Sequence, residues 1–143
     1  MPIVPPVADS PFVPKEIIFP IGLPGFPARR AFDVDEVNGT ALALLVAKDN
    51  GGPTFLVLTA PALYFPDLGP FDLDDATAGL IGATQSSDIV SWLIVTPRWA
   101  GPTANLLGPV VVNLGKGLAA QVVRKDLTLP VAAPLPSLEE PHA

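Results

Sequence analysis

Proline and glycine divide this sequence into short pieces, and that division restricts the chain to a fold of strands and turns. The 143 residues include 19 prolines and 12 glycines, and both residue types disfavour helix interiors and central strands. No helical apolar period persists, whereas β-branched and aromatic runs recur between turn residues. We therefore predict seven strands: Glu16–Phe19, Ala31–Val37, Thr40–Ala47, Thr54–Thr59, Ile89–Thr96, Val110–Leu114 and Leu118–Arg124.

The segments between these strands are predicted to be hairpin turns. Asn38-Gly39 supplies the positive φ angles of a tight type I′ turn. The stretch 48–53 predicts a looser hairpin, and Gly115-Lys116-Gly117 a tight one. Consecutive hairpins indicate an antiparallel meander.

Several of the predicted strands are apolar at successive positions. Leu42–Val46 and Phe55–Leu58 do not alternate between apolar and polar residues, so both of their faces should be covered. This favours a closed barrel or a tight sandwich over an open sheet. We predict an all-β fold, a small antiparallel β-barrel-like domain with one short helix.

The short helix is predicted to follow Asp72. Either Asp72 or Asp74 is suited to cap it, and Gly82 is suited to end it. Its apolar side would be formed by Ala76, Leu80 and Ile81.

The sequence suggests three parts. We expect an N-terminal extended segment over residues 1–15, the barrel domain over 16–129, and a loosely attached, proline-rich C-terminal tail over 130–143.

Composition argues against a membrane and against nucleic acid. Hydrophobic residues make up 49% of the chain and charged residues 15%, yet the longest apolar stretches, Ala41–Ala47 and Phe55–Pro66, fall short of the roughly 18 residues of a spanning helix. The N-terminus has no positive region followed by an apolar core, so we expect a cytoplasmic protein. A net charge of −6 repels phosphate backbones and attracts basic partners, such as an RNA-binding protein, although solubility is the more frequent reason for such a charge.

Residues suited to catalysis or metal binding are scarce. Cysteine is absent, and the single histidine is His142, one residue from the end. Asp72, Asp74 and Asp75 form the densest acidic cluster, but the further oxygen ligands and spaced Glu of a calcium loop are missing. These carboxylates are better explained as helix N-terminal charges. We predict no catalytic, cofactor-binding or metal-binding residues.

The two tryptophans are predicted to differ. Trp92 lies inside a strand and should belong to the core. Trp99 lies beside Arg98 in a loop with Gly101 and Pro102, where it would either be an exposed contact residue or cap the barrel. An exposed Trp or Arg is a typical interface anchor.

Three ordered motifs give the chain its resemblance to a known family. They are Phe19-Pro20-Ile21-Gly22-Leu23-Pro24-Gly25-Phe26, then Pro61-Ala62-Leu63-Tyr64-Phe65-Pro66-Asp67, then Thr103-Ala104-Asn105-Leu106-Leu107-Gly108-Pro109-Val110-Val111-Val112-Asn113 followed by Gln121-Val122-Val123. From about Ile17 to Val123 the sequence resembles the flagellar assembly factor FliW family.

The resemblance implies a small antiparallel β-barrel without catalysis or cofactor. It implies two protein partners: flagellin, and the translational regulator CsrA, which would be prevented from repressing flagellin messenger RNA. Free flagellin would then release CsrA by partner exchange. From their loop position beside the most acidic stretch, we predict a protein-binding face of Phe65, Asp67, Leu68, Asp72, Asp74 and Asp75.

The motif residues also have structural explanations. Gly22, Pro24 and Gly25 suit a turn, and Asn105 suits a side-chain brace to the backbone. Phe19 and Phe26 are expected in the core.

The sequence is compatible with two alternatives. The apolar strands are compatible with a barrel that binds a small apolar ligand in an interior pocket. An enzyme would need carboxylates such as Asp33, Asp35 or Glu36 to meet across neighbouring strands. The alternation of side chains along a strand permits such a meeting but does not predict it.

Overall fold

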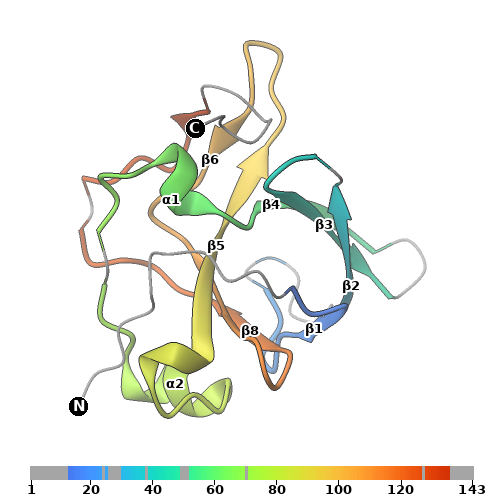
Figure 1. Cartoon of the computed structure of the whole chain (residues 1–143), viewed down its shortest axis with the longest axis vertical. Helices are drawn as coiled ribbons and strands as arrows, with labels where there is room; N and C mark the ends of the chain where they lie inside the picture. Colours follow the sequence, from blue (N-terminus) through green and yellow to red (C-terminus); the bar gives the residue numbers. More distant parts are fainter. Residues whose placement is uncertain are drawn as a thin grey trace.

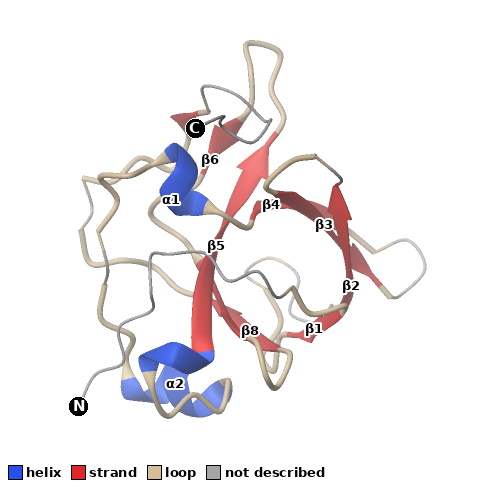
Figure 2. Cartoon of the chain, viewed as in Figure 1, coloured by secondary structure: helices blue, strands red, loops and turns tan. Residues whose placement is uncertain are grey.

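Seven strands form a closed barrel in this computed structural model, which describes residues 13–23, 25, 30–37, 39–48, 52–69, 71–126 and 128–135. Neighbours follow the order β1-β2-β3-β4-β5-β7-β8, and a parallel pair between Ile18 and Leu118 joins β8 back to β1. The strands β6 and β9 extend the sheet beyond β5 (Figure 2). The elements are β1 (Glu16–Ile18), β2 (Ala31–Val37), β3 (Leu42–Ala47), β4 (Thr54–Leu58), α1 (Pro61–Tyr64), α2 (Asp75–Leu80), the 3₁₀ turn η1 (Ser86–Asp88), β5 (Ile89–Thr96), β6 (Thr103–Ala104), β7 (Val110–Asn113), β8 (Leu118–Gln121) and β9 (Ala133–Pro134).

The predicted all-β barrel is confirmed, and all seven predicted strands are present. The predicted bounds of β2 and β5 match the structure, and the other five strands are shorter than predicted by one to three residues. The sequence prediction missed β6 and β9, which have two residues each and therefore carry no period. It also missed α1, a single turn that begins at Pro61.

The strand β5 shows why the sequence lacks polar alternation. Its side chains Val90, Trp92 and Ile94 belong to one apolar cluster, which fills the barrel interior, whereas Leu93 and Val95 belong to another on the outside. Both faces of the strand are thus covered, as predicted from the apolar runs. The cover on the outer face is not a second sheet layer but short elements laid against the barrel.

The barrel interior is occupied by large side chains. Trp92 is 2% exposed, and Phe19 and Phe32 are fully buried. The rings of Phe19 and Phe32 meet edge to face, with centroids 5.5 Å apart, a favoured aromatic geometry. Trp92 and Phe19 are therefore core residues, as predicted, while Phe26 lies outside the described residues.

Two outer clusters hold the remaining elements against the barrel. One contains Tyr64 from α1 with Ala104 from β6 and Ala133 from β9, all packed on the β3–β5 side. The other contains Ala78 of α2 and Ile81, packed on the outer faces of β5, β7 and β8. Figure 2 shows α1 and α2 at different levels beside β5.

The helix α2 is shorter than its sequence pattern suggested. Asp74 is its N-cap, and Gly82 follows the helix with a φ of +66°, as predicted. The predicted apolar side is wrong in part, because Ala76 and Leu80 are exposed while Ala78 and Ile81 are buried. A helix of six residues cannot present a full apolar stripe. Its contact with the barrel is therefore made by Ala78 and by Ile81, the residue that follows the helix.

Two predicted tight turns are wider than expected. Val37 pairs with Leu42, so four residues separate the paired positions, not the two of a type I′ turn. Thr40 sets this length: its hydroxyl donates to Val37 O at 2.7 Å and accepts from Leu42 N–H at 3.2 Å. Asn113 likewise pairs with Leu118 across four residues. Gly39 has the predicted positive φ, at +78°.

The C-terminal segment is attached more firmly than predicted. Ala133 pairs with Ala104 in the sheet, and Ala133 and Leu135 are buried. The expectation of a loose tail is therefore wrong for these residues, because small and apolar side chains there complete the outer cluster over β5. The predicted division into residues 1–15, 16–129 and 130–143 stays a prediction, since residues 1–12 and 136–143 lie outside the description.

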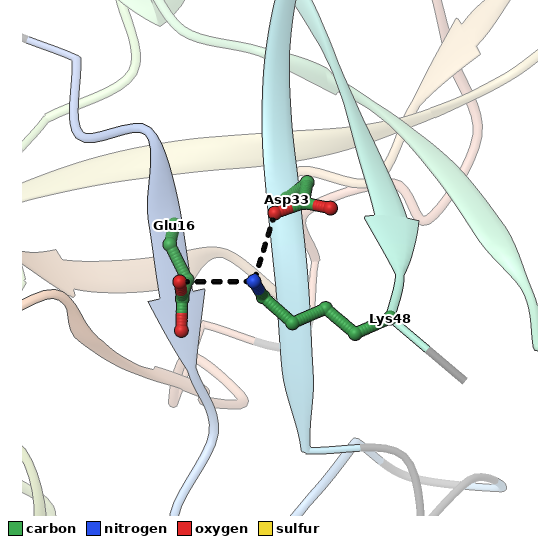
Figure 3. Close-up of polar contacts among 3 residues, drawn as sticks. All are labelled: Glu16, Asp33 and Lys48. Atoms are coloured by element: carbon green, nitrogen blue, oxygen red, sulfur yellow. Dashed lines mark ion pairs between the residues drawn. The ribbon is translucent and has the colours of Figure 1, made fainter.

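One lysine joins three strands on the outside of the barrel. Lys48, just after β3, places its Nζ 3.0 Å from Glu16 of β1 and 3.1 Å from Asp33 of β2 (Figure 3). Its hydrogen bonds to Glu16 and then to Asp33 raise the pKa of Lys48. The side chains are about half exposed, so this bridge contributes little stability. It does pair Asp33, one of the three carboxylates named for a possible enzyme, with a basic group.

Asn113 is the buried polar side chain that ties the barrel to α2. Its Nδ2 donates to Ile81 O at 2.9 Å, and its Oδ1 accepts from the N–H groups of Gly115 and Lys116 at 3.2 Å. The residue is 4% exposed. It therefore satisfies the backbone at the end of α2 and in the β7–β8 turn at once.

Replacing Asn113 by Ala should destabilise the fold. Leaving the buried Ile81 O without a partner costs about 1–3 kcal/mol, and the N–H groups of Gly115 and Lys116 also lose their acceptor. The Tm should fall by roughly 2–4 °C for each of these kcal/mol. Thermal unfolding followed by circular dichroism measures this, with the exposed Thr96→Ala as control. A Tm of Asn113→Ala that cannot be distinguished from the wild type would contradict the role of this side chain.

Candidate functional site

Two segments far apart in sequence form a continuous surface along one side of the barrel. We call it the lateral strip: residues 65–69 and 71–75 on one side, and residues 122–126, 128 and 129 on the other. Figure 1 shows the first segment running from α1 to α2 and the second coming from β8. Arg124 links them, because its Nη1 donates to Gly69 O at 2.9 Å and its guanidinium lies 4.9 Å from the Phe71 ring centroid.

The end of the lateral strip near α1 is an apolar depression of about 280 Å³. It is lined by Tyr64, Phe65, Pro66, Asp67, Leu68, Leu106 and Leu129. Phe65 and Leu68 are half-buried there, and Asp67 is exposed. An apolar surface beside one carboxylate suits an aliphatic or aromatic side chain with a basic neighbour.

The end near α2 is a wider, acidic groove of about 580 Å³. Its walls are Phe71, Asp72, Leu73, Asp74 and Asp75 on one side and Val122, Val123, Arg124, Lys125 and Asp126 on the other. Val123 is 72% exposed within this charged surrounding. An apolar side chain ringed by charge is a common arrangement at protein contact surfaces.

Two carboxylates of the strip are held in their charged form. Asp74 accepts from Thr77 N–H at 2.6 Å and from the Thr77 hydroxyl at 3.0 Å, and these bonds lower its pKa. The hydroxyl and the backbone N–H of Thr128 lower the pKa of Asp126 in the same way. Desolvation lowers the pKa of Arg124.

The net charge of the strip is negative. It contains five carboxylates, Asp67, Asp72, Asp74, Asp75 and Asp126, against the two basic groups Arg124 and Lys125. This excess favours a basic partner surface.

The structure divides the predicted protein-binding face between the two ends of the strip. Phe65, Asp67 and Leu68 line the apolar depression, whereas Asp72, Asp74 and Asp75 line the acidic groove. Sequence reasoning did not identify the second wall, which follows β8. Val122 and Val123 of that wall belong to one of the sequence motifs, but no sequence signal places them in a site, because the wall becomes part of the strip only when β8 brings it opposite the segment between α1 and α2.

The motif over residues 103–113 supports the strip, because its residue Leu106 lines the apolar depression. Asn105 Oδ1 accepts from the N–H groups of Leu107 and Gly108 at 3.1 and 2.9 Å, so the predicted side-chain brace is confirmed. Gln121 Nε2 donates to Gly108 O at 2.9 Å. A Cβ on Gly108 would lie 2.9 Å from Asn105 Nδ2 and 3.0 Å from Gln121 Nε2, so a larger residue would have to displace the two side chains that brace this loop. The same loop places Leu106 in the lining of the depression.

The carboxylates named for a possible enzyme do not form a reactive site. Asp33 is engaged by Lys48, and Asp33, Asp35 and Glu36 are all exposed. Glu36 lies on the opposite face of β2 from Asp33 and Asp35, because it pairs with the interior residue Ala43. Across the described residues, no group of three or more His, Cys, Asp or Glu side chains is placed to hold a metal ion. None of the helices in that part of the chain has the length and hydropathy to cross a bilayer.

The fold and the strip together define a small closed β-barrel whose candidate site is an open outer surface. A family profile described as FliW protein matches residues 10–135. The chain therefore belongs to the FliW family, as its motifs predicted.

Individual relatives support the same assignment. Flagellar assembly factor FliW of Heliobacterium modesticaldum is 37% identical over 117 residues, covering 78% of this chain and 74% of the relative. The protein of that name from Bacillus licheniformis is 31% identical over 114 residues, covering 78% and 79%. A crystal structure of the flagellar assembly factor FliW superposes with a TM-score of 0.76 at 27% identity, covering 86% of this chain and 87% of that one.

The N-cap role of Asp74 gives the site a testable pH dependence. Because its pKa is lowered by folding, its contribution to stability is present above the ordinary pKa of about 3.9 and is lost as pH falls through the lower folded value. Asp74→Ala should cost about 1 kcal/mol at pH 7, whereas Asp74→Asn should cost much less because asparagine also caps helices.

Urea unfolding at pH 7 and at pH 3 measures both effects. The difference between wild type and Asp74→Ala should shrink at the lower pH. An equal loss for the Ala and Asn variants at pH 7 would show that Asp74 does not act as a cap.

Proposed function

We propose that this protein is a binding regulator of flagellar assembly, which holds flagellin and antagonises a CsrA-type translational repressor. The observation that carries the proposal is the lateral strip on a FliW-family barrel. The strip combines an apolar depression, an acidic groove and an exposed Val123 on one continuous surface.

The charge of the strip supports the regulator as a partner. A protein that binds messenger RNA presents basic groups to phosphates, and the same groups are attracted by a surface on which carboxylates outnumber basic side chains. The protein then competes with RNA for the regulator, or obstructs RNA binding to it, without resembling RNA in shape. Such attraction mainly raises the association rate and selects against acidic partners.

The apolar depression supports an exchange between the two partners. A depression lined by Phe65, Leu68 and Leu129 suits an apolar side chain of flagellin, and a flagellin chain bound there lies beside the acidic groove. Flagellin and the regulator would thus occupy overlapping parts of the strip, so that free flagellin releases the regulator.

The alternative of a small-ligand barrel is not favoured. Phe19, Phe32 and Trp92 occupy the barrel interior, and the apolar depression and the acidic groove lie outside it. We further propose that the protein acts in the cytoplasm, because its proposed regulator partner binds messenger RNA. We also propose that it acts by binding alone, because the strip offers complementary surface and no convergent reactive groups among its described residues.

Neutralising the acidic groove tests the proposed function. The variant Asp72→Asn/Asp74→Asn/Asp75→Asn removes three charges, while the asparagine introduced in place of Asp74 preserves the helix cap. Each exposed charge contributes about 0.2–1 kcal/mol, so affinity for the regulator should fall roughly tenfold and become less dependent on salt. Isothermal titration calorimetry with purified regulator, and separately with flagellin, measures this.

A matched control separates local from global charge. Asp33→Asn/Asp35→Asn/Glu36→Gln changes the net charge by the same amount on another face of the barrel, and it should leave both affinities nearly unchanged. Unchanged binding of both partners to the groove variant would remove the proposed face. Equal losses in the two variants would show that net charge, not this groove, drives binding.

A further inference from the structure

The connection between β5 and β6 carries a tryptophan that the fold does not use. Trp99 is 105% exposed, whereas Trp92 of β5 is 2% exposed in the core. The alternative that Trp99 caps the barrel is therefore wrong. Full exposure of the largest apolar side chain is unfavourable in water, so a contact that buries Trp99 would be stabilised by the hydrophobic effect.

The tip of this hairpin, residues 97–101, has a defined backbone. Gly101 N–H donates to Arg98 O at 3.0 Å, which closes a turn with Trp99 at its corner. Arg98 Nε donates to Thr103 Oγ1 at 3.0 Å, and Thr96 pairs with Thr103 below the tip. Figure 1 shows the hairpin extending beyond the end of the barrel. Trp99 is thus presented by a preorganised element, which lowers the entropy cost of binding.

The charge of the tip differs from that of the strip. Arg98 is the one ionisable residue between Thr96 and Thr103, in a chain of net charge −6. A basic, RNA-binding surface would be repelled by Arg98 and attracted elsewhere. The tip instead suits a partner that offers an apolar pocket without positive charge.

The hairpin also adjoins the lateral strip. Ala104 of β6 pairs with Val95 of β5, and Leu106, two residues further along, lines the apolar depression. A partner that occupies the depression can therefore extend along β6 to the tip. Of the two proposed partners, flagellin fits this description, because the regulator is drawn to the acidic groove at the other end of the strip.

We propose that Trp99 is an aromatic anchor contacted by flagellin and not by the regulator. The inference rests on the proposed function, since it names which of its two partners uses the hairpin. Flagellin would overlap the regulator on the strip and hold an additional contact on the tip. That extra contact would let flagellin displace the regulator, whereas the reverse exchange would be disfavoured.

The test compares Trp99→Ala and Trp99→Phe with wild type by calorimetry against purified flagellin and purified regulator. Trp99→Ala should weaken flagellin binding about 30-fold, the usual size of a hot-spot loss, and Trp99→Phe should weaken it less. Regulator affinity should stay within about twofold, and flagellin should displace the regulator less effectively from Trp99→Ala. Ile21→Ala, which truncates another exposed apolar residue, is the control and should change neither affinity.

Several results would overturn the inference. Unchanged flagellin affinity in Trp99→Ala, or an equal loss of both partners, would show that the tip is not a flagellin anchor. Self-association of the wild type in sedimentation, abolished in Trp99→Ala, would assign the tip to a second copy of this chain instead. If the wild-type protein binds neither flagellin nor the regulator, that result would reject the proposed function itself, independently of any Trp99 variant.

Discussion

Barrel closure is the constraint on which the rest of this structure depends. The strands β3, β4, β5 and β7 carry apolar side chains toward both faces, so neither face can be left in water without a large loss of hydrophobic stabilisation. Pairing of β4 with β5 and of β1 with β8 closes the inner face around Phe19, Phe32 and Trp92. The outer face must then be covered by short local elements.

The lateral strip is a consequence of that outer cover. The chain between α1 and α2 lies against the barrel through Phe65, Leu68, Phe71 and Leu73, and the segment after β8 returns beside it. The charged side chains of these segments are mostly acidic, while the apolar ones are only partly used by the fold. A surface made of such cover segments can change its contacts without disturbing the core, since the barrel beneath it is independently closed.

Much of the fold was predictable from particular residues, and the limits have physical reasons. Long apolar runs such as Ile89–Thr96 identify strands that are covered by apolar neighbours on both faces. Asp74 and Gly82 likewise mark the two ends of α2. The two-residue strands β6 and β9 were not predictable, because their pairing joins Ala104 to the distant Ala133. The same holds for the site: the acidic residues were visible in sequence, but their juxtaposition with Val123 and Leu129 exists only after β8 has joined the barrel.

Amide hydrogen exchange in the complex with the CsrA-type regulator tests the central claim most directly. If the strip is the contact surface, then residues 71–75 and 122–126 should be protected on binding, while β2 and β3 on another side of the barrel should exchange as in the free protein. Protection confined to β2 and β3, with residues 71–75 and 122–126 unaffected, would contradict the claim that this protein works through the lateral strip.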